Sequence, residues 1–174
     1  KISKKMTQIE NIKIKNFNKD NSQKKIKVLL DKIIYEDNHI IKSLKNTYKD
    51  LWDLKKIKKY KIFSNVALIG MGGSIMGSRS IYSFLKDKIK KKFYFIDNFE
   101  NNKIEEIKKK NKLNLIISKS GNTLETIVNS NVIINKATKN IFITENKNSY
   151  LKSLAVKLKS DVIDHNNFIG GRYS

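Results

Sequence analysis

The chain of 174 residues contains no cysteine and no proline, and all but two of its 37 basic residues are lysine. Without cysteine it forms no disulfide framework and no thiolate metal site, a composition that fits a reducing compartment, so we expect a cytoplasmic protein. It also lacks the ~18-residue apolar run that a membrane span needs, and its lysine-rich start has no signal-peptide core. We therefore expect no membrane partner.

The formal net charge of +21 suggests nucleic-acid binding, because clustered cations bind a phosphate backbone without regard to sequence. Specific recognition of phosphates and bases favours the bidentate arginine fork, however, and arginine occurs only at Arg79 and Arg172. Abundant lysine, asparagine and isoleucine are typical of a genome biased toward A/T-rich codons. We interpret the lysines as solvated surface and expect no nucleic-acid partner.

Hydrophobic periodicity changes along the chain. Apolar residues recur on one helical face over 26–34 and again over 40–51. Five apolar runs follow that are typical of buried strands, at 66–69, 93–96, 113–117, 141–144 and, more weakly, 161–164. Helical patterns lie between them at 81–89, 124–132 and 151–158. These patterns predict an N-terminal helical segment over 1–60 that packs on a domain over 61–174.

Strands that alternate with helices run parallel, and right-handed crossovers place helices on both faces of the sheet. The predicted fold is therefore α/β, a three-layer α/β/α sandwich with a five-stranded parallel sheet, preceded by N-terminal helices. Ligands bind such sheets beyond the carboxyl ends of the strands, where loops meet helix N-termini. Three segments at such positions combine glycines with polar residues.

The first segment, 70–77, reads GMGGSIMG and joins the first strand to a helix. Its glycines allow an anionic ligand to approach the free N–H groups of the helix start, and Ser74 adds a hydroxyl donor. A dinucleotide-binding fingerprint with Asp97 as ribose ligand competes with this interpretation, but Ile75 stands where the fingerprint needs its last glycine. A tight turn that binds nothing is the remaining alternative.

The second segment, 118–126, reads SKSGNTLET and follows the third strand. It holds three hydroxyl donors, at Ser118, Ser120 and Thr123. Hydroxyls and backbone N–H groups at a helix start, from Lys119 onward, favour a cradle for one phosphate monoester. The alternative is ordinary capping, in which Asn122 is the N-cap and Glu125 completes a capping box, so Glu125 serves either the helix or the site.

The third segment, 170–174, reads GGRYS and follows the last strand. Its two glycines allow the guanidinium of Arg172 to approach a ligand closely, where it would stabilise a developing oxyanion. The alternative is a solvent-exposed arginine at a frayed chain end.

Taken together, the three segments resemble the glucose-6-phosphate isomerase family, whose N-terminal lobe is a flavodoxin-like sugar-isomerase (SIS) domain. The family shows G-x-G-G-S-x-x-G, S-K-[ST]-x-x-T-x-E-T and G-G-R-[FY]-S in this order, and the match covers residues 65–174. The resemblance implies interconversion of glucose 6-phosphate and fructose 6-phosphate, in glycolysis and gluconeogenesis, without a metal or organic cofactor. The Gly121-Asn122 pair instead resembles other SIS phosphate loops, which keeps open a non-catalytic module that binds or senses phosphosugars.

The resemblance also implies roles for the matching residues. Those that would bind the sugar phosphate are Gly73, Ser74, Ser118, Lys119, Ser120, Thr123 and Gly171. Arg172 would stabilise the enediolate as a catalytic residue, with Glu125 near the substrate. The family's base glutamate, ring-opening histidine and catalytic lysine follow the GGR segment, so we expect an N-terminal fragment that is inactive alone and belongs to a homodimeric enzyme.

Overall fold

The computed structural model describes residues 23–43, 47–49, 53–99, 107–108, 111–135 and 137–173. The chain divides into two compact units, residues 1–45 and 46–174. This division falls before the predicted boundary at residue 60, because residues just ahead of the sheet are bonded to it. The hydroxyl of Tyr60 donates to Asp161 Oδ2 over 2.8 Å, and Lys59 Nζ lies 2.5 Å from the same oxygen.

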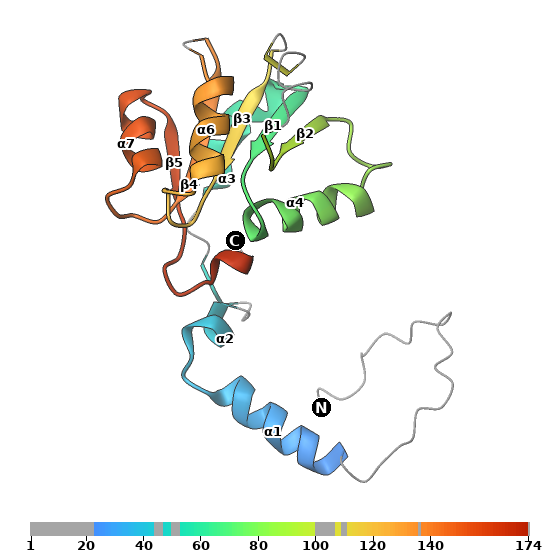
Figure 1. The fold of residues 1–174 in the computed structure, drawn as a ribbon. Coiled ribbons are helices and arrows are strands. Elements are labelled where there is room, and N and C mark those ends of the chain that lie inside the picture. The colour runs from blue at the N-terminus through green and yellow to red at the C-terminus, as the bar shows by residue number, and fades with distance from the viewer. Residues whose placement is uncertain are drawn as a thin grey trace. The chain divides into compact units, whose positions relative to one another are not determined.

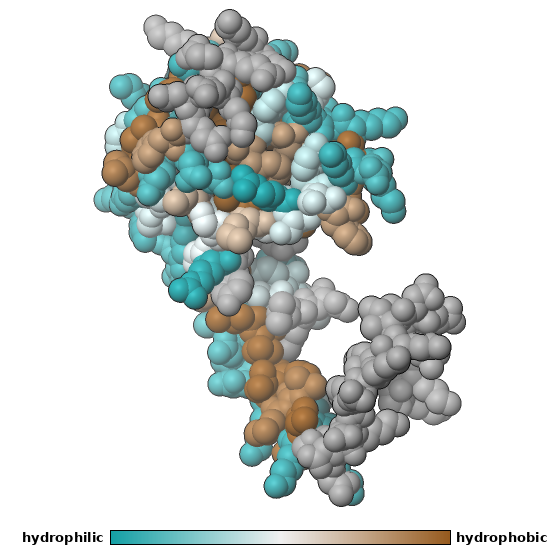
Figure 2. Space-filling model, turned by 45° about the vertical axis from the view of Figure 1, so that its right-hand side comes forward, coloured by the Kyte–Doolittle hydropathy of each residue, from teal (hydrophilic) through white to brown (hydrophobic). Residues whose placement is uncertain are grey.

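The first unit contributes two described helices, α1 (Gln23–Tyr35) and α2 (His39–Ser43). The apolar side chains of α1 remain about half exposed, from 44% for Ile34 to 58% for Ile26, and form a continuous hydrophobic surface on this helix (Figure 2). A helix over 40–51 was expected from periodicity, but α2 ends at Ser43 and residues 47–49 are not helical. The hydroxyl of Ser43 donates to the Ile40 carbonyl over 2.7 Å, a local bond that competes with the helical ladder. The remaining expected positions, 44–46 and 50–51, lie outside the described residues.

The second unit alternates strands with helices (Figure 1). Its elements are α3 (Leu54–Lys58), η1 (Lys59–Ile62), β1 (Asn65–Ile69), α4 (Gly73–Phe84), β2 (Lys92–Ile96), β3 (Leu113–Ile117), α6 (Leu124–Ile133), β4 (Lys139–Thr144), α7 (Tyr150–Lys157), β5 (Asp161–Asp164) and η2 (Gly171–Tyr173). All five strands occur where short apolar runs predicted them. Among the described residues, no helix combines the length and the hydropathy that crossing a bilayer requires.

The five strands form one parallel sheet in the order β2-β1-β3-β4-β5. The predicted three-layer α/β fold is thereby confirmed, and this order is the flavodoxin-like one. Val66 of β1 pairs with Phe93 on one side and Leu113 on the other. Successive strands are therefore added on one side of β1 up to β2 and on its other side from β3 onward. The loops after β1 and β3 consequently lead to opposite sides and leave a crevice between them.

Alternating strand residues build a hydrophobic core on each face of the sheet. Ala67 and Ile69 of β1 pack with Ile133 of α6 and with Leu151 and Ala155 of α7. Leu68 points to the other face and packs with Ile75 of α4 and Ile117 of β3. Burying each aliphatic side chain contributes about 1.5–3 kcal/mol, so both faces hold the helices in place.

The helix α4 departs from its predicted pattern. It ends at Phe84, so that the expected position Ile89 lies beyond it, and its Ile81 and Phe84 are 61% and 89% exposed. The sheet contacts come instead from Ile75, which is 1% exposed, and from Tyr82, whose ring centroid lies 5.1 Å from that of Phe93. The first turn of α4 is therefore held against the end of β1.

Candidate functional site

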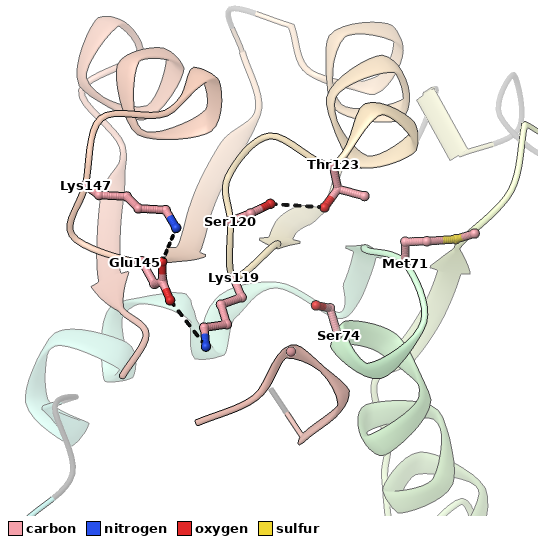
Figure 3. Close-up of a pocket in the computed structure, with 8 residues that line it drawn as sticks. Met71, Ser74, Lys119, Ser120, Thr123, Glu145 and Lys147 are labelled. Atoms are coloured by element: carbon pink, nitrogen blue, oxygen red, sulfur yellow. Dashed lines mark hydrogen bonds and ion pairs between the residues drawn. The ribbon is translucent and has the colours of Figure 1, made fainter. Parts of the chain in front are cut away.

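A cavity of about 420 Å³ opens at the carboxyl ends of the strands, beside the β1–β3 reversal (Figure 3). The described residues that line it come from the loops after β1, β3 and β4 and from the C-terminal turn: Met71, Ser74, Lys119, Ser120, Thr123, Glu145, Lys147 and Gly171. All three segments singled out in the sequence thus contribute to one cavity.

The hydroxyl residues after β3 form two layers. Ser120 and Thr123 line the cavity with their hydroxyl oxygens 3.5 Å apart (Figure 3). Ser118 lies beneath them, 2% exposed, with its Oγ 2.9 Å from Thr123 Oγ1 and accepting the Gly121 N–H over 3.2 Å. The structure therefore gives Ser118 a supporting position, whereas a direct contact between Ser118 and a phosphate stays a prediction.

The same loop is fastened to the start of α7. Gly121 has a positive φ of 67°, and a Cβ there would lie 2.2 Å from the Oγ of Ser149, so only glycine fits. The Asn122 Oδ1 accepts the Tyr150 N–H over 2.9 Å, and the Gly121 carbonyl accepts the Leu151 N–H over 3.0 Å. The loop thereby satisfies N–H groups of the first turn of α7.

Asn122 consequently does not cap α6, contrary to the alternative considered from the sequence. The N-cap of α6 is Thr123, and its side chain makes no capping hydrogen bond. The first N–H groups of α6 therefore stay available to an anion in the cavity, at the positive end of the helix dipole. Glu125 is half buried in the first turn and is not among the described residues that line the cavity, so its catalytic role stays a prediction.

The C-terminal turn lies directly against the start of α4. A Cβ on Gly73 would come within 2.2 Å of the Gly171 carbonyl oxygen and 2.4 Å of the Arg172 Cα. The two backbones are therefore in contact, and Gly171 and Ser120 line one cavity. The Arg172 side chain is exposed and is not among the lining residues described, so its role in catalysis also stays a prediction.

Two charged residues at the rim, Glu145 and Lys147, were not predicted. Glu145 contacts Lys147 Nζ through Oε2 and lies 3.4 Å from Lys119 Nζ through Oε1 (Figure 3). The hydrogen bond from Lys147, followed by that from Lys119, lowers the pKa of the Glu145 carboxyl. The sequence could have indicated them as site residues, because both follow the carboxyl end of a predicted strand.

His165 lies near this charged group on the loop after β5. Its Nδ1 is 2.8 Å from the Asn166 carbonyl oxygen. Burial lowers the pKa of His165, and the Lys119 charge lowers it further, whereas the Asn166 carbonyl and Glu145 raise it. The lowered pKa favours the neutral form of His165.

Asp97, the ribose ligand of the dinucleotide alternative, has another partner. Its carboxylate is paired with Arg79 at 2.9 Å, and Arg79 lies over the Phe95 ring at 5.3 Å. Asp97 is not among the described residues that line the cavity. These contacts favour an anion cradle over a dinucleotide site.

A family model described as phosphoglucose isomerase matches residues 4–174. The glucose-6-phosphate isomerase of Methanocaldococcus jannaschii is 39% identical over 133 residues, covering 70% of this chain and 32% of that protein. That of Treponema denticola is 33% identical, covering 70% and 28%, and that of Mycoplasmoides gallisepticum is 30% identical, covering 83% and 36%. The chain spans about a third of the length of the curated relatives it matches.

Solved structures show the same fold at lower identity. A hypothetical protein, TT0462 from Thermus thermophilus, superposes with a TM-score of 0.59 at 22% identity, covering 69% of this chain and 33% of that one. Tagatose-6-phosphate ketose/aldose isomerase from Escherichia coli superposes with a TM-score of 0.54 at 15% identity, covering 69% and 36%. At these identities the likeness shows the fold alone.

Proposed function

Because this chain belongs to the phosphoglucose isomerase family, we propose that it forms the N-terminal sugar-phosphate-binding part of an enzyme that interconverts glucose 6-phosphate and fructose 6-phosphate. The intact enzyme works as a homodimer in the cytoplasm and needs no metal or organic cofactor. The observation that carries this proposal is the shared cavity, in which the hydroxyl loop at 118–123 and the C-terminal Gly171 meet.

One end of the cavity suits the phosphate group of a sugar phosphate, and the other end suits its sugar. The phosphate accepts hydrogen bonds from Ser120, Thr123 and the first N–H groups of α6, where the helix dipole favours a negative charge. The sugar then extends toward Ser74 and Gly171. Arg172 follows Gly171 and neutralises the enediolate oxygen that forms when a proton leaves the substrate.

Proton transfer between C1 and C2 needs a general base whose pKa lies near the working pH. Glu145 is the described carboxylate that lines the cavity, but two lysines bind it and its lowered pKa makes it a weak proton acceptor. We therefore assign the base to a part of the enzyme other than the described residues of this cavity, and expect the chain alone to be inactive.

The same observation supports a second candidate, a non-catalytic module that binds or senses phosphosugars. In that case the cavity binds a phosphosugar without converting it, and the Gly121-Asn122 pair serves only to fasten the loop at 118–123 to α7. An isomerase assay on the whole gene product separates the two candidates, since turnover supports the enzyme and binding without turnover supports the module.

Calorimetry with fructose 6-phosphate tests the cavity itself. Replacing Ser120 and Thr123 together by alanine removes two hydroxyl donors to a charged phosphate, so we expect affinity to fall about a hundredfold or more. The matched control replaces two exposed hydroxyl residues of α4, Ser80 and Ser83, and leaves affinity unchanged. Undiminished binding by the Ser120→Ala/Thr123→Ala variant excludes the proposed cradle.

A further inference from the structure

Three charged side chains form a row along one wall of the cavity (Figure 3). Glu145 lies between Lys119 and Lys147 and contacts both ammonium groups. The side chain of Glu145 is 10% exposed, that of Lys119 23% and that of Lys147 51%. An ion pair shielded in this way is less screened than a surface pair, so it restrains the position of Lys119.

Lys119 also joins two separate segments. Its Nζ donates to the carbonyl oxygen of Asn167 over 2.9 Å, on the loop that leads into the C-terminal turn. Its aliphatic stem lies beside Gly171, where a Cβ would be 3.9 Å from the Cβ and Cδ of Lys119. Gly171 is exposed and lies beside both the Lys119 stem and the backbone of Gly73.

We propose that Glu145 is a positioning residue for the sugar-binding end of the cavity: it holds Lys119 against the C-terminal loop and thereby keeps Gly171 and Arg172 in place. This inference rests on the proposed function, since it assumes a sugar phosphate in the cavity. Two of the three donors of the Lys119 ammonium group are then used within the protein, at Glu145 and Asn167.

If Glu145 acted only through its charge, removing it would strengthen ligand binding, whereas a positioning role predicts weaker binding. A carboxylate beside an anion site repels a phosphate, so replacing it by a neutral amide raises the positive potential and tightens the binding of any phosphate. A positioning role instead predicts a loss that is confined to ligands with a sugar. The sign of the change and its dependence on the ligand therefore distinguish the two roles.

The experiment measures the affinity of the 174-residue chain for fructose 6-phosphate and for inorganic phosphate by calorimetry. We expect Glu145→Gln to weaken fructose 6-phosphate binding about tenfold, as one hydrogen bond to a charged group is lost, and to leave phosphate binding unchanged or tighter. Glu145→Asp, which keeps the carboxylate, restores part of the sugar phosphate affinity. Asp161→Asn is the matched control, because it removes another lysine-bound carboxylate, at the amino end of β5 and so away from the carboxyl ends where the cavity opens, and changes neither affinity.

Equal changes for both ligands, or no change for either, overturn the inference and leave the proposed function standing. Wild-type chain that binds inorganic phosphate but not fructose 6-phosphate refutes the proposed function, and the inference with it. If Glu145→Gln does not fold, Lys119→Met takes its place. That variant removes a cation from the cavity and so weakens the binding of both ligands. Because it also loses both contacts of the ammonium group, the loss must be larger for fructose 6-phosphate than for inorganic phosphate.

Discussion

Gly73 is a residue at which two distant parts of the chain come into close contact. The family resemblance implied that Gly73 lines the sugar site, but it gave no physical reason for a glycine there. The structure gives a steric reason. Its Cα hydrogen faces the backbone of Gly171 and Arg172, where no larger group fits. The glycine therefore allows the C-terminal turn to close on the cavity.

Gly73→Ala introduces a Cβ within 2.2 Å of a backbone carbonyl oxygen, so the C-terminal turn must move away. We expect a loss of unfolding free energy of about 1–3 kcal/mol and at least about tenfold weaker binding of fructose 6-phosphate. Urea denaturation and calorimetry measure the two effects.

Gly77→Ala is the control in the same helix. Apart from its chain neighbours and the backbone of its own helix, no atom of the described residues lies within 4 Å of its ideal Cβ, and α4 continues on both sides of it. Alanine there raises the unfolding free energy by about 0.5–1 kcal/mol through helix propensity and leaves binding unchanged. If Gly73→Ala and Gly77→Ala have the same unfolding free energy and the same affinity for fructose 6-phosphate, the steric explanation for Gly73 is wrong.

At the scale of elements, the loop at 118–123 and the helix α7 support each other. Asn122 binds the N–H of Tyr150, while Ser149 is the N-cap of α7 and accepts the Lys152 N–H. The loop conformation, and so the placement of Ser120 and Thr123, depends on a helix that begins 28 residues further along the chain. This explains why the glycine and asparagine between the hydroxyl residues suit the loop.

Asn122→Ala leaves the Tyr150 N–H without its acceptor. We expect about 1 kcal/mol lower unfolding free energy, the usual cost of losing an N-terminal cap, measured by urea denaturation. Asn122→Asp keeps an oxygen acceptor at the positive end of α7 and should retain most of the stability. If Asn122→Ala is as stable as the wild type, the contact with α7 does not fasten the loop.

For the whole molecule, three lowered pKa values make the stability of the fold depend on pH in the acid range. The pKa values of His165, Glu145 and Asp161 are all lowered, by burial for His165 and mainly by hydrogen bonds from lysine for the two carboxyls. A lowered folded-state pKa means that the unfolded chain binds the proton more readily. Each group therefore contributes stability above its ordinary pKa and loses that contribution as the pH falls through the folded value.

We expect unfolding free energy to decline in two stages on acidification, first below pH 6.5 through His165 and then, more acidic, below about pH 4.5 through Glu145 and below about pH 3.8 through Asp161. Urea denaturation at stepped pH values measures both stages. Replacing His165 by asparagine should flatten the first stage and leave the second unchanged. If the His165→Asn variant still loses stability just below pH 6.5, a group other than His165 causes that loss.

The sequence by itself determined the strands, the alternation of elements and the hydroxyl-rich loop at 118–123. Each rests on a local signal: apolar runs such as 113–117 are long enough for a buried strand, and the hydroxyls of Ser118, Ser120 and Thr123 stand within six positions. The periodicity over 40–51 misled because a pattern of apolar residues does not fix where a helix ends, and α2 ends at Ser43.

Only the tertiary structure decided which loops meet. Glu145 reaches the cavity because β4 lies beside β3. Asn122 accepts the Tyr150 N–H of α7, and does not cap α6, because the start of α7 lies next to the loop. The contact of Gly73 with Gly171 depends in the same way on how the C-terminal turn folds back. Strand order and loop closure depend on contacts between residues far apart in the chain, and no local pattern encodes them.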